Sequence, residues 1–77
     1  MNKARRARLQ EAIDLIEQAK DIMSEVKDEE EEAYDSMPES FQDSDRGESM
    51  RENIDTLGGA IDEADDLQKN LIDVVEG

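Results

Sequence analysis

Two long stretches of the chain place apolar residues alternately three and four positions apart, and this spacing constrains the fold more than any other feature. Residues at this spacing line one side of an α-helix, whereas a half-buried strand needs strict alternation. The repeating positions are, in the first stretch, Leu9, Ala12, Ile16, Ala19, Met23 and Val26, and in the second, Met50, Ile54, Leu57, Ile61, Ala64, Gln68, Leu71 and Val75. The sequence therefore predicts two long helices, at about residues 4–34 and about residues 45–75.

The connection between the two helices, about residues 35–44, contains the only proline of the chain. Pro38 disfavours the helical conformation at the residue before it, so the first helix must end near Tyr34. Asp43 or Ser44 can accept the free amides of the first turn of the second helix. Ser36 and Glu39 have the spacing of a capping box, which predicts a short helical turn after Pro38. Two helices of equal length with a short connection fold back as an antiparallel hairpin, a single all-α domain over residues 1–77.

A hairpin of this size leaves apolar residues uncovered. Ile13, Leu15 and Ile22 flank the main stripe of the first helix, and the stripe is then too wide for one partner helix. A chain of 77 residues also buries little apolar surface on its own. We therefore expect the hairpin to dimerise into a four-helix bundle. The sequence does not decide whether larger oligomers also form.

The chain is strongly acidic, with 23 Asp and Glu residues against nine Lys and Arg and a formal net charge of −14. This charge repels nucleic acids and anionic membranes, so we expect neither to be bound directly. No histidine or cysteine is present, and no residue run is apolar enough to span a bilayer. The usual proton shuttle and soft nucleophile are thus missing, which favours a binding protein over an enzyme, without cofactor or metal, in the cytoplasm.

Negative charge is most concentrated near the end of the first helix, where five consecutive residues are acidic. Carboxylates there oppose the helix dipole and repel one another, so the run costs helix stability. One interpretation is a solvated face that keeps the protein soluble. The other is a surface that imitates the phosphates of a nucleic acid and occupies a nucleic-acid-binding protein. The candidate residues are Asp28, Glu29, Glu30, Glu31 and Glu32.

The hairpin tip gathers residue types that are rare elsewhere in the chain, including both aromatic residues. A guanidinium group beside aromatic and amide side chains can hold a phosphate and a base. The alternative is that Arg46 pairs with nearby carboxylates and only fastens the tip. The candidate ligand-binding residues are Tyr34, Phe41, Gln42, Ser44, Arg46 and Arg51.

Three further patterns are less specific about structure or function. Lys3, Arg5, Arg6 and Arg8 form a basic head, which in a hairpin lies beside the acidic end of the second helix and either pairs with it or binds an anion. Asp43, Asp45 and Gly47 have nearly the order of a calcium loop, but the glycine comes one position early. Gly58 and Gly59 interrupt the second helix and predict either a tolerated weak point or a close approach of another backbone.

The connection carries a recognisable pattern, Tyr34-Asp35-Ser36-Met37-Pro38-Glu39, followed by Gln42, Ser44 and Arg46 and then by Ile54-Asp55 within an acidic helix. In these residues the chain resembles small acidic helical-hairpin proteins of bacteriophages and prophages. Such proteins usually continue with helix-forming residues where this chain has Gly58-Gly59.

The resemblance implies a place and a role. It implies a protein of the infected bacterial cytoplasm that antagonises antiviral defence by sequestration. The tip would capture a nucleotide-derived immune signal, or the acidic surface would occupy a nucleic-acid-binding defence protein. The alternative is an oligomeric scaffold, assembly or regulatory adaptor of a phage, which would bind phage proteins or itself.

Overall fold

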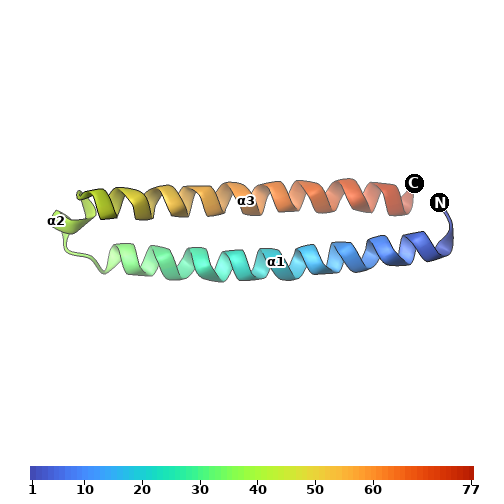
Figure 1. Cartoon of the computed structure of the whole chain (residues 1–77), viewed down its shortest axis with the longest axis horizontal. Helices are drawn as coiled ribbons and strands as arrows, with labels where there is room; N and C mark the ends of the chain where they lie inside the picture. The colour runs from blue at the N-terminus through green and yellow to red at the C-terminus, as the bar shows by residue number, and fades with distance from the viewer.

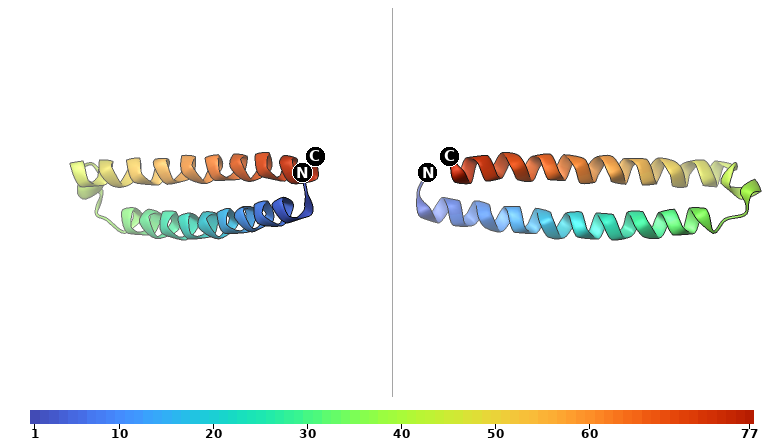
Figure 2. Two further views of the ribbon diagram at one scale, coloured as in Figure 1. Left: turned by 45° about the vertical axis from the view of Figure 1, so that its right-hand side comes forward. Right: turned by 180° about the vertical axis from the view of Figure 1, so that it is seen from behind.

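The protein is a thin antiparallel pair of helices joined by a compact tip (Figure 1). The computed structural model describes residues 1–77, with extents of 58 × 15 × 13 Å. Helix α1 spans Lys3–Asp35, the short helix α2 spans Glu39–Gln42, and α3 spans Asp45–Glu76. Both termini lie at one end of the rod, and α2 lies at the other, as the two further views also show (Figure 2). The all-α prediction is confirmed, and the two long helices pack against each other.

Side-chain caps decide where the long helices begin. The Asn2 carboxamide oxygen accepts from the amide of Arg5 at 2.9 Å and starts α1. Of the two residues expected to start the second helix, Ser44 is the cap, and its hydroxyl accepts from the amide of Gly47 at 3.4 Å. The helical turn expected after Pro38 is α2, but no side chain caps it. Ser36 instead ends α1, so it does not act as the capping-box residue.

On α3, the residues that meet α1 are those that the sequence predicts. The partly or fully buried residues that repeat along α3 are Gly47, Met50, Ile54, Leu57, Ile61, Ala64, Gln68, Leu71 and Val75. Except for Gly47, which precedes it, this is the predicted stripe. We call the surface along which α1 and α3 meet the seam. The helix runs unbroken through Gly58 and Gly59, and a Cβ at Gly59 would meet nothing within 4 Å.

On α1, the seam differs from the predicted stripe. Every second seam residue comes one position after the residue that the spacing predicts. The repeating residues of the seam are Leu9, Ile13, Ile16, Lys20, Met23, Lys27, Glu30 and Tyr34. Ala12 stays partly buried at its margin, whereas Ala19 and Val26, which the spacing assigns to the main stripe, are exposed. Lysine can occupy a seam because its apolar stem packs while its ammonium group reaches water or a carboxylate.

The seam contains very little that is fully buried. Ile13 is the single buried apolar side chain, at 6% exposure, and Gln68 and Gly47 are the other buried residues. The exposed large apolar residues include Leu15 and Ile22, at 57% and 61%. No helix combines the length and the apolar character that crossing a membrane requires. The hairpin therefore has two broad, solvent-facing sides and no closed core.

Candidate functional site: an acidic face and a tip hollow

The seam divides the hairpin surface into two broad faces. Positions seven residues apart lie on the same side of a long, slightly supercoiled helix. Because α1 and α3 are right-handed and antiparallel, residues that come just before seam positions lie on one face, and residues just after them lie on the other. Two contacts agree with this assignment. Ala33 and Arg46, which both come just before seam positions, line one hollow. Lys20 reaches across the seam to Asp65, which comes just after a seam position.

The face that follows the seam is densely acidic. We call it the acidic face, and its residues are Gln10, Asp14, Glu17, Asp21, Ser24, Asp28, Glu31 and Asp35 on α1 and Glu48, Arg51, Asp55, Gly58, Asp62, Asp65, Lys69, Ile72 and Glu76 on α3. Eleven of these side chains are carboxylates and two are cations. Each helix repeats such positions every three or four residues, about 5 Å along the axis. The two helices therefore carry two parallel rows of negative charge.

The opposite face has a different composition. We call it the apolar face, and its residues are Arg8, Ala12, Leu15, Ala19, Ile22, Val26, Glu29 and Ala33 on α1 and Arg46, Ser49, Asn53, Thr56, Ala60, Glu63, Leu67, Asn70 and Val74 on α3. It holds two carboxylates and two cations, so its side chains sum to zero charge in a protein of net charge −14. Most acidic residues of the two long helices therefore lie on the acidic face and on the outer edges.

A charged cluster fastens the middle of the acidic face to the seam. Lys20 Nζ lies 3.1 Å from Asp65 Oδ1 and 3.1 Å from Glu17 Oε2, and Lys69 Nζ lies 3.0 Å from Asp65 Oδ2. The Gln68 side-chain amide donates to the Ile13 carbonyl at 3.0 Å and to Glu17 Oε2 at 2.9 Å. Two carboxylates and two cations here neutralise each other, so the free negative charge lies on either side of this cluster.

The cluster also shifts the ionisation of its members. The hydrogen bond from Gln68, and then that from Lys20, holds the pKa of Glu17 below its ordinary value. The hydrogen bond from Lys69, and then that from Lys20, does the same for the pKa of Asp65. The hydrogen bonds to Asp65 raise the pKa of Lys20 and the pKa of Lys69. All four groups are therefore held in their charged forms.

The acidic run that the sequence singles out does not form one surface. Five consecutive helical residues point around the whole circumference of the helix. Asp28 and Glu31 lie on the acidic face, and the Glu31 carboxylate is 2.7 Å from Lys27 Nζ. Glu29 belongs to the apolar face, Glu30 lies in the seam, and Glu32 lies on the outer edge. The larger acidic surface is formed by both helices together, so it cannot be recognised from the sequence of either helix alone.

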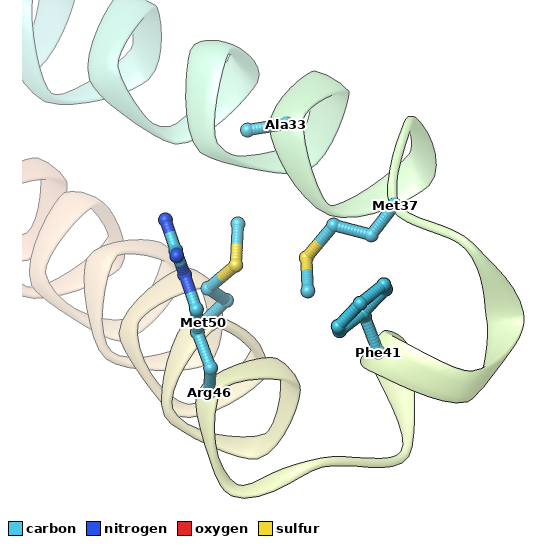
Figure 3. A pocket seen from close by; sticks show the side chains of 5 residues that line it. All are labelled: Ala33, Met37, Phe41, Arg46 and Met50. Carbon is cyan, nitrogen blue, oxygen red and sulfur yellow. The ribbon is translucent and has the colours of Figure 1, made fainter.

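The tip contains an open hollow of about 330 Å³, lined by Ala33, Met37, Phe41, Arg46 and Met50. Figure 3 shows the Met37, Phe41 and Met50 side chains turned toward one another, with the Arg46 side chain extending beside Met50. Phe41 is 58% exposed, so it borders the hollow rather than filling the end of the bundle. Arg46 forms no ion pair and is the single charged group of the hollow.

The other candidate tip residues lie elsewhere or have structural tasks. The Gln42 side-chain amide donates to the Tyr34 carbonyl at 2.9 Å and thereby caps the end of α1. The Ser44 hydroxyl donates to the Phe41 carbonyl and accepts from Gly47. Arg51 lies on the acidic face beside Glu48, Glu52 and Asp55, about 140° around α3 from Arg46. The structure brings together Phe41 and Arg46 but not Arg51.

Gly47 is a tip residue whose importance the sequence does not reveal. A Cβ at this position would lie 2.1 Å from the Gln42 carbonyl oxygen and 2.7 Å from that of Phe41. The backbone of α2 therefore crosses directly over the first turn of α3. The one available signal is a glycine in the first turn of a helix, where better helix formers are usual.

The basic head remains free at the other end of the rod. The ion pairs of the hairpin all belong to Lys20, Lys27 and Lys69, so Lys3, Arg5, Arg6 and Arg8 make none with the acidic end of α3. Met1, Arg5, Arg8 and Leu9 line a shallow surface depression there. No group of three Asp or Glu side chains is placed so that it could hold a metal ion. Comparisons with models of protein families, with curated proteins and with solved structures find no match to this chain.

Proposed function

We propose that this protein acts without catalysis, by laying its acidic face in the basic, nucleic-acid-binding groove of another protein. The observation that carries the proposal is the separation of charge between the two broad faces, eleven carboxylates on one and two on the other. Duplex DNA presents one negative charge per about 1.7 Å of axis from two strands. The carboxylates of the acidic face follow one another at intervals of about 5–10 Å on α1 and about 5–16 Å on α3, along a 58 Å rod, and offer a much sparser form of the same pattern.

The tip hollow supports ligand capture less well than the acidic face supports protein binding. A phosphate-bearing ligand would meet one cation, Arg46, because Arg51 lies on the other side of α3. The hydroxyl of Ser44 and the amide of Gln42 are already bonded to backbone carbonyls. In a protein of net charge −14, a single arginine offers little compensation for a phosphate.

The resemblance of the connection to phage proteins is the ground for our proposal about the target. We propose a nucleic-acid-binding defence protein of the bacterial host, which the acidic face would hold away from its own substrate. A phage scaffold or adaptor is the competing role. The two differ in one property: occupation of a nucleic-acid groove must be reversed by free duplex, whereas a scaffold contact has no reason to respond to it.

We also propose that the acting species is a dimer in which two hairpins form a four-helix bundle. A compact monomer of 8.7 kDa has an accessible surface of about 4,700 Å². The hairpin exposes 5764 Å², about 1,000 Å² more than a compact monomer. Each partner in a standard stable interface buries about 800 Å². The surplus thus has the size of one side of a dimer interface.

The test is a competition experiment on proteins captured from bacterial lysate. The immobilised protein should retain partners that a 20-base-pair DNA duplex displaces and that elute at moderate salt, because screening weakens exposed charge contacts. Replacing Asp21, Asp55 and Asp62 by Asn should abolish the capture. The control replaces Glu25, Asp66 and Asp73, on the outer edges, by their amides with the same change of charge. Partners that resist duplex, or that bind both triple variants equally, would contradict the proposal.

A further inference from the structure

The apolar face has the composition of an interface and no cover within one hairpin. Six large apolar side chains on the two long helices are exposed, and five of them, Leu15, Ile22, Val26, Leu67 and Val74, lie on this face. The sixth, Ile72, is the least exposed of the six, at 37%, and lies on the acidic face. Apolar residues concentrated on one side of a monomeric protein mark a surface for association.

The stripe on α1 is arranged symmetrically about Ala19. Leu15 and Ile22 lie four and three residues from it, and Ala12 and Val26 lie seven residues from it on either side. Beyond them come Arg8, eleven residues before Ala19, and Glu29, ten residues after it. An array that is apolar in the middle, with opposite charges at nearly equal distances, is complementary to its own reversed copy. A two-fold interface requires this kind of self-complementarity.

We infer that the apolar face binds a second copy of this chain, with the two α1 helices antiparallel and crossing at Ala19. Leu15 then packs on the partner's Ile22, Ala12 on the partner's Val26, and Arg8 lies beside the partner's Glu29. Arg8 is exposed and makes no ion pair within its own hairpin, so it is free to do this. The inference deepens the proposed dimer and is independent of what the acidic face binds.

Charge decides in favour of a second copy over another occupant. With apolar faces together, the two acidic faces point in opposite directions, so most of the negative charge of the two chains stays apart. The small side chain of Ala19 lets the two helices approach at the axis. The surplus surface of about 1,000 Å² per hairpin agrees with burial of one face. The dimer places one tip at each end and one acidic face on each side.

The first experiment uses a single cysteine at the axis. The chain has no cysteine, so Ala19→Cys introduces the only thiol. Two Cα atoms closer than about 7 Å can be bridged, and this arrangement brings the residue to its own copy. Mild oxidation should convert most of the variant to a disulfide-linked dimer. Gln18→Cys, one residue away on the outer edge, is the matched control and should stay monomeric on a non-reducing gel.

The second experiment exchanges the end charges. Arg8→Glu alone and Glu29→Arg alone should each raise the dimer dissociation constant about tenfold, because like charges then meet at both ends of the interface. The double exchange should restore it to within about threefold of the parent. Lys3→Glu, which makes the same change on the side of the acidic face, should leave the constant within about twofold.

Each outcome decides the inference. Rapid cross-linking at Ala19→Cys together with rescue by the double exchange supports it. A light-scattering mass near 8.7 kDa for the parent at micromolar concentration overturns the dimer and this interface together, while duplex-sensitive capture of partners can still succeed. A parent dimer whose Ala19→Cys form does not cross-link overturns the interface alone. A cross-link between Leu15→Cys and Leu67→Cys chains instead would show hairpins side by side with their tips together.

Discussion

The tip and the stem of the hairpin are held in different ways. At the tip, α2 crosses the first turn of α3 so closely that the Gln42 carbonyl occupies the space of a side chain at Gly47. Along the stem, α1 and α3 meet through side chains, and Ile13 is the single apolar one that is buried. A backbone crossing accepts one residue type at its closest point, whereas a side-chain seam accepts many. We therefore expect substitutions in the two regions to differ in the kind of change they cause as well as in how much stability they cost.

The largest expected effect is at the buried point of the stem. Ile13→Ala should lower the free energy of unfolding by about 3 kcal/mol, because it removes buried methyl groups and leaves a space that the helices cannot fill. Urea unfolding at one fixed protein concentration measures it. Ile72→Ala, which removes the same atoms from an exposed site, is the control and should cost under about 1 kcal/mol. Equal losses would mean that the stem has no anchoring residue.

Next comes the tip. Gly47→Ala should cost about 2 kcal/mol, because the new methyl group requires the backbone of α2 to move away from α3. The displacement should alter the amide resonances of Phe41 and Gln42 and leave those of the stem in place. A two-dimensional amide spectrum and a melting curve measure both consequences. A variant with parental stability and spectrum would show that the crossing is looser than the structure has it.

The same substitution at the second glycine of the Gly58-Gly59 pair should act in the opposite direction. A Cβ at Gly59 meets nothing within 4 Å, so Gly59→Ala should stabilise the protein by about 1 kcal/mol through the restriction of the unfolded chain. Melting temperature reports the gain. Gly58→Ala should gain less, since its methyl group would lie 3.4 Å from Lys27 Cε. A loss of stability at Gly59 would show that this position touches something in solution, such as a partner subunit.

The smallest expected effect concerns pH. Hydrogen bonds from Gln68 and then Lys20 hold the pKa of Glu17 below its ordinary 4.5, so the unfolded chain binds a proton here at a higher pH than the folded one. The stabilisation by ionised Glu17 is therefore present above pH 4.5 and is lost as pH falls through the lower folded value. Glu17→Gln should melt slightly earlier than the parent at pH 7, and this difference should shrink below pH 4.5. Glu25→Gln, at an exposed residue without an ion pair, is the control.

The stem also shows where apolar spacing is a sufficient guide and where it is not. On α3, the predicted stripe from Met50 to Val75 is the seam, because the apolar residues of this helix concentrate there. On α1, apolar residues form two stripes that share a helix. Spacing assigned Ala19 and Val26 to the partner helix, whereas Lys20 and Lys27 lie there instead. Lysine carries no apolar signal, although its stem packs like an apolar residue.

The tip sets a different limit. Phe41 and Arg46 come together as their concentration in the connection predicts, and the capping function of Ser44 follows from its type and place. The separation of Arg51 from Arg46 follows from helical geometry once the helix is known to begin before both of them. The function of Gly47 depends on the path that the backbone takes through α2, so a glycine in the first turn of a helix hints at it but does not reveal it.

The thinness of the rod has a consequence for how its motions are measured. With extents of 15 and 13 Å across, every backbone amide of α1 and α3 is at most one side chain from solvent. Amide hydrogen exchange in a single hairpin should therefore report local fraying of helical turns rather than one global opening. Slow exchange in the middle of α1, around Ala19, would then measure how often that stretch is covered by another molecule. A dilution series of exchange rates at those few amides becomes a direct record of association.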